Sequence, residues 1–368
     1  MRKANIDLAE GTDVSDYLAN GEIIKDEKKV ETYVISGLAI WDTPYNPIEW
    51  GIKDMIPMRK KTVAVGDFES GKSYLYLGAA LSLAAGKSEY LGFEIPKQRK
   101  VLYVDLENGQ DETIHRILNL TAGHNIDSNK CEDTLRIIVK PGDFSDVFVM
   151  IEAQTESFKP DVIIIDNLYQ LSGANNIADA DKIKPLLSKI ENLRSSSNAG
   201  VVLIHHFNKN TQEQGLTEER MAGSSVINWW YEYCTILGKT NRGFSLYTVG
   251  KSRMGSKNPG IYGIEINDRI GGGVVMERGG LVPAEHVKGL MLPERRRTKW
   301  DLQLQRMADE FTTNEWLNVC GDQDGESVAD VTAYRWLKEI LSVGMIEKVI
   351  HGKYRKTELE FYKNDFQE

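Results

Sequence analysis

The sequence predicts an α/β fold with a mainly parallel β-sheet, followed by a small C-terminal domain with a different periodicity. Between residues 61 and 238, apolar runs of strand length alternate with stretches of helical spacing. Runs such as VIIID and GVVLI are continuously apolar, which is typical of strands covered by helices on both faces. A chain of 368 residues is long enough for one large domain and one small domain.

We expect an acidic N-terminal arm at residues 1–35, followed by the core at residues 36–292. Helices are expected over 75–85, from about residue 112 and from about residue 180. Two later segments, FSLYTVGKSRMG and IYGIEIND, are expected to extend the sheet. The core strands are expected, in chain order, in the segments KTVAV, KVLYVDLE, LRIIV, DVIIIDN, GVVLIHH and CTILG.

The segment VAVGDFESGKS, residues 63–73, carries the strongest functional signal. Its glycines and the closing Gly-Lys-Ser have the spacing of a phosphate-binding loop between a strand and a helix, although a plain Gly-rich turn is the alternative. Such a loop binds ATP and Mg²⁺: Lys72 would contact the β and γ phosphates, and the Ser73 hydroxyl would ligate the metal. The predicted nucleotide-binding residues are Gly66, Asp67, Phe68, Glu69, Ser70, Gly71, Lys72, Ser73 and Tyr74.

Two acidic residues that follow buried strands are candidates for the chemistry. Asp166 ends the run VIIID, where a charge without a partner is costly, so we interpret it as support for the magnesium shell; a turn cap is the alternative. Glu107 follows the strand after the P-loop helix and is predicted to activate the attacking water. Asp105 competes for that role, but its position inside the strand favours a supporting one.

Two further pairs of residues could act on the γ-phosphate. The adjacent His205 and His206 must point to opposite sides of their strand, so one of them can face the nucleotide. Zinc binding would need a third ligand, and none has suitable spacing. Lys251 and Arg253 share one face of a strand and could reach a neighbouring subunit's γ-phosphate; a solvated basic edge is the alternative.

Residues 298–365 are predicted to form a winged-helix domain, because three helical segments precede a hairpin centred on His351 and Gly352. The domain could bind DNA or dock onto a protein, and the sequence leaves both open. The sides that usually meet DNA are the third helix (Thr332, Tyr334, Arg335 and Lys338) and the wing (Lys348, His351, Lys353, Arg355 and Lys356).

Composition excludes some classes of protein. The net charge of −9 opposes uniform coating of nucleic acid but is compatible with a local basic channel. Three scattered cysteines form no metal or disulfide pattern, which indicates a reducing compartment. No apolar stretch has the length of a membrane span and the N-terminus lacks the apolar core of a signal peptide, so we expect a cytoplasmic protein without a membrane partner.

The order of these motifs, together with RMAGSS at residues 220–225, resembles that of RecA-fold hexameric helicases over about residues 40–268. The sequence is most similar to the RepA-like replicative helicases of plasmids and phages, and more distantly to DnaB-type helicases. The resemblance implies a RecA-like P-loop core and a homo-oligomer, a hexameric ring, that hydrolyses ATP while it translocates on single-stranded DNA. A replication initiator or a primase would be a further partner.

The resemblance also implies roles for individual residues. His206 would sense the γ-phosphate, and Lys251 and Arg253 would act in trans on the adjacent subunit's ATP. The loops 172–181 and 209–221 would face DNA, with Lys209 and Arg220 as contacts. Asp67 and Glu69, where the family often has small residues, would make the mouth of the P-loop acidic. Two alternatives stay open: a RecA-fold ATPase of recombination or defence that does not unwind DNA, and a winged-helix regulator controlled by ATP.

Overall fold

The structure is a computed structural model that describes residues 2–7, 29–34, 47–139, 147–173, 177–209, 211–223, 225–255, 258–269, 272–291, 300–321, 328–342 and 344–357. Contacts divide the chain into two units, Met1–Ile48 and Glu49–Glu368. In the first unit, β1 (Arg2–Asp7) pairs antiparallel with β2 (Lys29–Val34), within the segment expected to be an acidic arm.

Within the described residues, the second unit has a central sheet of nine strands in the order β15-β14-β13-β12-β5-β11-β10-β8-β9. The six strands from β12 to β9 run parallel, which confirms the predicted mainly parallel sheet. The other three are antiparallel: β13 (Ser245–Ser252), β14 (Ile261–Asp268) and β15 (Val274–Leu281). The parallel strands are β5 (Lys61–Gly66), β8 (Val101–Asp105), β9 (Leu135–Val139), β10 (Val162–Asp166), β11 (Gly200–His206) and β12 (Tyr233–Lys239).

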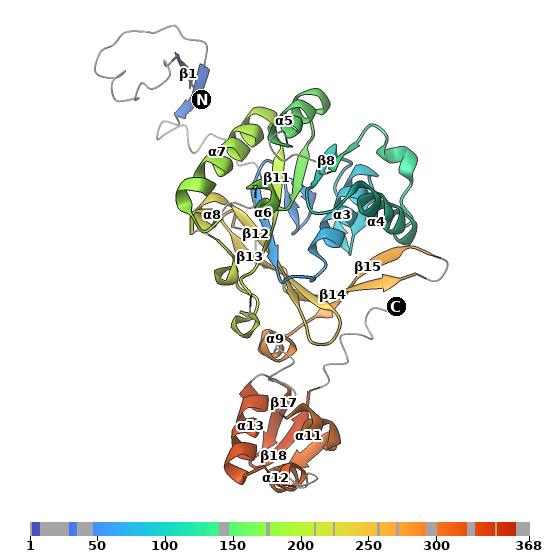
Figure 1. Ribbon diagram of the computed structural model, residues 1–368, viewed down its shortest axis with the longest axis vertical. Coiled ribbons are helices and arrows are strands. Elements are labelled where there is room, and N and C mark those ends of the chain that lie inside the picture. Colours follow the sequence, from blue (N-terminus) through green and yellow to red (C-terminus); the bar gives the residue numbers. More distant parts are fainter. Residues whose placement is uncertain are drawn as a thin grey trace, which may run out of the picture. The chain divides into compact units, whose positions relative to one another are not determined.

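Helices cover both faces of this sheet (Figure 1), because successive apolar residues of each strand point to opposite sides. One buried cluster joins the strands to α3 (Lys72–Ala84) and α4 (Gln110–Gly123). A second cluster on the other face joins them to α5 (Val147–Phe158), α7 (Ala180–Ser197) and α8 (Ser225–Trp230). Short elements complete this part: β3 (Trp50–Ile52), β4 (Ile56–Pro57), β6 (Glu89–Tyr90), β7 (Phe93–Glu94), α6 (Leu168–Leu171) and α9 (Ala284–Leu290).

The register of the parallel strands brings their carboxyl ends to one edge of the sheet. His206 lies opposite Gly66, and Asp166 lies opposite Asp105. Because β11 lies between β5 and β10, the acidic end of β10 is one strand removed from the P-loop strand. The P-loop, the two histidines and the strand ends that precede Glu107 and contain Asp166 therefore lie together at this edge of the sheet.

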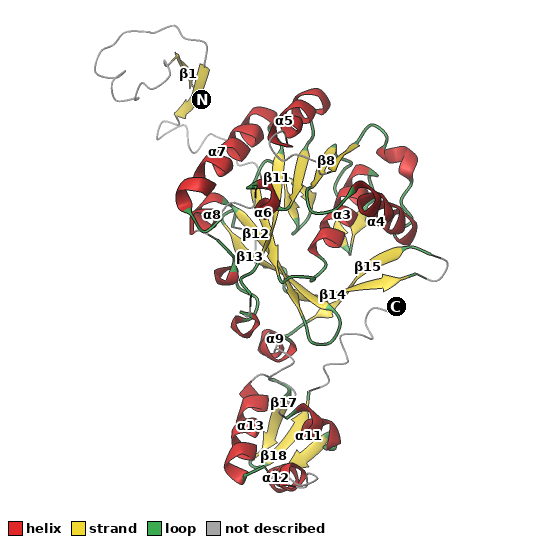
Figure 2. Ribbon diagram, in the orientation of Figure 1, coloured by secondary structure: helices red, strands yellow, loops and turns green. Residues whose placement is uncertain are grey.

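The C-terminal part contains three helices and a three-stranded antiparallel sheet among the residues described (Figure 2). Its core includes Trp316, Leu337 and Ile340, and the Trp316 indole N–H donates to the Ala333 carbonyl at 2.8 Å. The hairpin turns at Gly352, which has a φ of +75°. The elements, in order, are α11 (Asp301–Arg306), β16 (Glu310–Thr312), α12 (Thr313–Gly321), α13 (Asp330–Ser342), β17 (Ile346–Ile350) and β18 (Lys353–Lys356).

In the part of the chain that the structure describes, no helix has the length and apolar character needed to cross a bilayer.

Candidate active site

The P-loop follows β5 and opens α3, as the sequence predicts. A side chain at Gly66 would place its Cβ 2.0 Å from the Leu237 carbonyl oxygen of β12, so only glycine permits this strand contact. Gly71 has a φ of +88° and is the N-cap of α3, where no side chain makes a capping hydrogen bond. The first N–H groups of α3 are therefore suited to an anionic ligand such as a phosphate.

Lys72 is buried inside the loop. Its Nζ donates to the carbonyl oxygens of Gly66 at 3.2 Å and Asp67 at 2.5 Å. Burial lowers the pKa of Lys72 to about 8, while the negative charges of Asp166, Asp67 and Glu107 act in the opposite direction. A buried ammonium group beside a helix N-terminus is the arrangement that binds the phosphates of a nucleotide.

Asp166 and Ser73 fit a magnesium ion. Burial raises the pKa of Asp166 to about 6, and hydrogen bonding from the Ser73 and Tyr103 hydroxyls partly offsets this effect. Tyr103 donates to Oδ2 at 3.0 Å, whereas the buried Oδ1 accepts no hydrogen bond from any residue that the structure describes. Carboxylate and hydroxyl oxygens are the ligand types that Mg²⁺ prefers. Bound there, the ion would neutralise charge on the phosphates.

Asn167 connects the predicted base to the predicted γ-phosphate sensor. Its Nδ2 donates to Glu107 Oε2 at 2.8 Å and lies 3.2 Å from His206 Nε2. Its Oδ1 accepts from the Gln170 backbone N–H at 3.0 Å, which caps α6. Asn167 was not among the predicted site residues, although its position directly after the strand-ending Asp166 was a signal that the sequence offered.

Hydrogen bonding also distinguishes the role of Glu107 from that of Asp105. The Asp105 carboxylate accepts hydrogen bonds from the backbone N–H groups of Glu107 and Asn108 and from the Thr113 hydroxyl. It therefore shapes the turn that carries Glu107, which itself is exposed at the start of that turn. Of these two acids, Glu107 is the one placed to contact a water molecule.

The two histidines face opposite sides of β11. His205 is fully buried, and its Nε2 lies 2.7 Å from the Ala222 carbonyl oxygen. His206 points toward Asn167 and lies near the exposed Phe68 ring, with a centroid distance of 6.0 Å. Burial lowers the pKa of both imidazoles to about 4, so both are neutral at pH 7. Among the described residues, no group of three or more His, Cys, Asp or Glu could hold a metal ion.

The interpretation of Arg220 as a DNA contact needs correction, because its side chain is fully buried. Its guanidinium pairs with Asp67, donates to the Gly215 carbonyl at 2.8 Å and lies 4.0 Å from the centre of the Phe207 ring. Asp67 is buried as well, so it does not contribute to an acidic mouth.

The other predicted loop residues lie at the surface or at its margin. Glu69 is exposed and pairs with Lys239 at 3.0 Å. Tyr74 is half-buried with the Arg116 guanidinium 5.1 Å from its ring centre, and Lys209 is exposed. Ser70 is buried, and its carbonyl accepts from the Ser245 hydroxyl at 2.8 Å, which joins the P-loop to the start of β13.

Lys251 and Arg253 lie at the opposite edge of the sheet from their own P-loop. Ser245, at the start of β13, contacts the P-loop, and Lys251 follows six residues later, roughly 20 Å along an extended strand. At that end, Lys251 Nζ donates to the Asn228 carbonyl at 3.2 Å and Arg253 donates to the Trp229 carbonyl at 3.1 Å. Neither cation can reach the phosphates bound by its own subunit.

Part of the chain matches a known protein family. Residues 32–212, just under half of the chain, match the protein family described as an AAA domain. No curated protein matches the sequence. The crystal structure of a KaiC-like protein from the hyperthermophilic archaeon Pyrococcus horikoshii OT3 is similar with a TM-score of 0.45 and 13% identity, covering 63% of this chain and 99% of that chain. The partial family match and the geometry of the P-loop together indicate a nucleotide-binding site.

Proposed function

We propose that the protein is an ATP-dependent DNA helicase that translocates on single-stranded DNA as a cytoplasmic, hexameric ring during replication of a mobile element. The observation that carries this proposal is the division of the ATP site between two edges of one sheet. Lys72, Glu107, Asp166 and His206 gather at one edge, and the cations at the end of β13 lie at the other. A cation that cannot reach the P-loop of its own subunit can contact the γ-phosphate bound by an adjacent subunit. Contacts of this head-to-tail kind join subunits into rings.

Binding of single-stranded DNA is assigned to the loop that follows β11. Lys209, at the start of this loop, is exposed, whereas Arg220 at its end is fixed against Asp67. His206 and Lys209 are three residues apart, so a change at the γ-phosphate can be transmitted directly to the DNA loop. Contacts of this kind act on phosphates rather than on bases and are salt-dependent.

For the C-terminal part we infer a winged-helix domain, on the basis of its order of helices and strands. Two of the wing's cations are paired with acids of the same domain: Lys353 pairs with Glu310 at 2.5 Å, and Arg355 pairs with Glu310 at 2.8 Å and Glu347 at 3.0 Å. Cations held by acids within the domain attract DNA phosphates weakly. This pairing favours docking onto a protein, such as a replication initiator or a primase, over a site-specific DNA regulator.

The trans assignment is tested by replacing Arg253 and then mixing two inactive variants. Arg253→Ala should retain binding of a slowly hydrolysed ATP analogue and lose ATP turnover. Lys72→Ala should lose nucleotide binding. A 1:1 mixture should recover up to about a quarter of wild-type turnover, because an intact P-loop then meets an intact Arg253 at a quarter of the subunit contacts. Full activity in Arg253→Ala alone, or no recovery in the mixture, contradicts the assignment.

Strand separation is measured separately, on a forked DNA substrate with ATP and Mg²⁺. The helicase proposal requires displacement of the paired strand together with hydrolysis that single-stranded DNA stimulates. Stimulated hydrolysis without displacement would favour the recombination or defence ATPase instead.

A further inference from the structure

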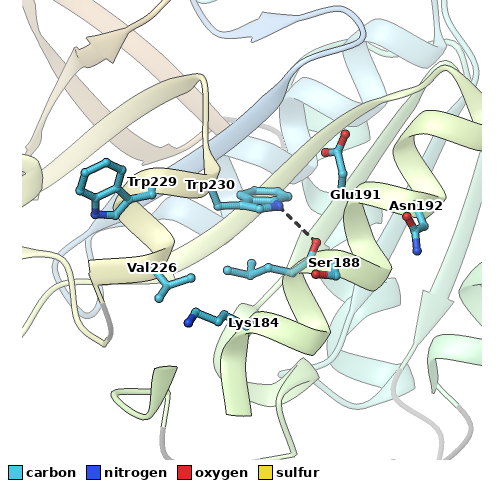
Figure 3. A pocket seen from close by; sticks show the side chains of 8 residues that line it. Lys184, Ser188, Glu191, Asn192, Val226, Trp229 and Trp230 are labelled. Carbon is cyan, nitrogen blue, oxygen red and sulfur yellow. Dashed lines mark hydrogen bonds between the residues drawn. The ribbon is translucent and has the colours of Figure 1, made fainter. Parts of the chain in front are cut away.

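A pocket between α7 and α8 opens beside an exposed indole (Figure 3). The pocket measures about 440 Å³. Trp230 is fixed at its floor by a hydrogen bond from its indole N–H to the Leu187 carbonyl at 3.2 Å, whereas the neighbouring Trp229 side chain is 76% exposed. An exposed tryptophan next to a pocket is typical of a protein contact site. The lining residues are Lys184, Leu187, Ser188, Glu191, Asn192, Val226, Trp229 and Trp230.

This pocket and the cations of β13 belong to one surface, because Arg253 donates to the Trp229 carbonyl and Lys251 to the Asn228 carbonyl. On α7, the exposed Lys184 lines the same pocket, together with Glu191. We call this basic and aromatic area the α7–α8 surface.

A surface of opposite character lies on the other face of the sheet. On α4, the exposed side chains of Ile114 and Leu118 are four residues apart and form an apolar stripe. The first turn of the same helix contains the exposed Asp111 and Glu112, which follow the exposed Glu107 of the ATP site by four and five residues. We call this acidic and apolar area the α4 surface.

We propose that the α4 surface of one copy of this chain binds the α7–α8 surface of the next copy, with Trp229 packed against the stripe of Ile114 and Leu118. We infer that the binding partner is a second copy of this chain, because one chain carries both surfaces: the α4 surface is acidic and apolar, and the α7–α8 surface is basic and aromatic. The two surfaces lie on opposite faces of the sheet, so the contact is head-to-tail.

This inference rests on the proposed function and specifies its subunit contact. Arg253 donates a hydrogen bond to the Trp229 carbonyl, and α4 begins at Gln110, three residues after Glu107. Packing of the Trp229 indole against α4 of the neighbouring copy therefore brings Arg253 close to the neighbour's ATP site, where the γ-phosphate of the neighbour's ATP would bind.

The test uses two charge-introducing variants of the full chain, in sedimentation with Mg²⁺ and a slowly hydrolysed ATP analogue. Leu118→Lys places a cation against the basic surface, and Trp229→Glu places an acid against the acidic one. Each should lower the association constant at least tenfold, since buried aromatic anchors dominate such contacts. A 1:1 mixture should again form at least dimers, because one intact surface of each kind remains in the pair.

Two exposed apolar residues outside both surfaces provide matched controls. Val149 on α5 is 62% exposed and Leu281 on β15 is 60% exposed, so Val149→Glu and Leu281→Lys should assemble like the wild type. All four variants should unfold at the wild-type temperature. In the wild-type assembly, a carbodiimide should join lysines of α7 to Asp111 or Glu112 of another copy.

The outcomes separate this inference from the proposed function. Assembly and hydrolysis that survive both Leu118→Lys and Trp229→Glu would overturn the inference alone. Cross-links from α7 to residues 1–46 in place of α4 would also overturn it, because the N-terminal segment would then cover the pocket. If the variants behave as expected but single-stranded DNA neither binds nor stimulates hydrolysis, the helicase proposal fails and the subunit contact stands.

Discussion

Asn167 holds the candidate base and the candidate sensor in one hydrogen-bonded chain. Glu107 follows β8 and His206 ends β11, and the Asn167 amide contacts both. A base acts efficiently when its position relative to the attacked group is fixed. Loss of the amide should therefore slow hydrolysis without weakening nucleotide binding.

We predict that Asn167→Ala lowers kcat for ATP by roughly 10² and leaves the Kd of a slowly hydrolysed analogue within about twofold, since positioning of a general base contributes on this order. Steady-state kinetics and calorimetry measure the two quantities. Gln170→Ala is the control, because the network uses only the backbone N–H of this residue. An equal loss of affinity and turnover in Asn167→Ala would contradict a positioning role.

Lys72 provides a prediction about pH. Its pKa of about 8 in the folded protein lies below the ordinary value, because burial disfavours the ammonium form. Between pH 8 and 10.5 the folded protein has lost this proton and the unfolded chain still holds it, so the free energy of unfolding rises with pH over this range. Over the same range Lys72 loses the positive charge that attracts phosphates. Nucleotide affinity should be constant below pH 8 and fall up to about tenfold per pH unit above it.

Equilibrium binding of a fluorescent ATP analogue between pH 7 and 9.5 measures this decline. In Lys72→Arg the guanidinium stays charged, so any remaining affinity should not change over this range. Wild-type affinity that is constant up to pH 9.5 would show that Lys72 keeps its proton.

The Arg220–Asp67 pair makes a structural prediction. Arg220→Met leaves a buried carboxylate without its partner, which should lower the free energy of unfolding by about 3–5 kcal/mol. Asp67→Asn combined with Arg220→Met should cost clearly less than the sum of the single changes. Urea unfolding of the three variants measures the coupling, and strictly additive losses would mean that the two side chains do not stabilise each other.

Most of the elements that carry the site follow from local sequence patterns. The continuous apolar runs become β5, β8, β10 and β11, and the apolar stretch after the P-loop becomes α3. The patterns did not indicate α5 or β15. VFVMIEAQTESF is apolar at its start and could equally form a strand, and VVMERGGL contains a glycine pair that is unusual in strands.

The close contact between α4 and β15 requires glycine at position 123. A Cβ at Gly123 would lie 1.9 Å from the Val274 carbonyl oxygen, and this backbone cannot move independently of its strand. Gly123→Ala should therefore lower the free energy of unfolding by about 1–3 kcal/mol through overpacking. Chemical denaturation measures the change.

Gly321→Ala is the matched control, because a Cβ there would meet no described atom within 4 Å. Its stability should equal or slightly exceed that of the wild type, since alanine favours helix. An unchanged stability in Gly123→Ala would show that β15 moves away from α4 without cost.

Across the whole protein, the cations that the sequence predicted to meet DNA lie in the loop after β11 and in the C-terminal domain, and their ion pairs distinguish the two regions. Lys209 is exposed in the loop after β11, whereas Arg355 of β18 is bound by Glu310 and Glu347. The net charge of −9 makes such local differences decisive.

We predict that Lys209→Ala weakens binding of single-stranded DNA and reduces the slope of log K against log salt concentration by about 0.7, the value for one released phosphate contact on a single strand. Arg355→Ala should leave both quantities unchanged. Fluorescence anisotropy at several salt concentrations measures them. A larger effect of Arg355→Ala would move the DNA site to the C-terminal domain.

The sequence by itself determined the fold class, the P-loop and the candidate acids, because strands, helices and the loop between them depend on neighbours a few residues apart. The spatial order of the strands decided the rest. It placed Asn167 beside Glu107, 60 positions away, joined Arg220 to Asp67 across 153 positions, and put Lys251 and Arg253 beyond the reach of their own P-loop. The spacing of residues along the chain does not predict these contacts, because they form only when separate strands pair in register and exclude water.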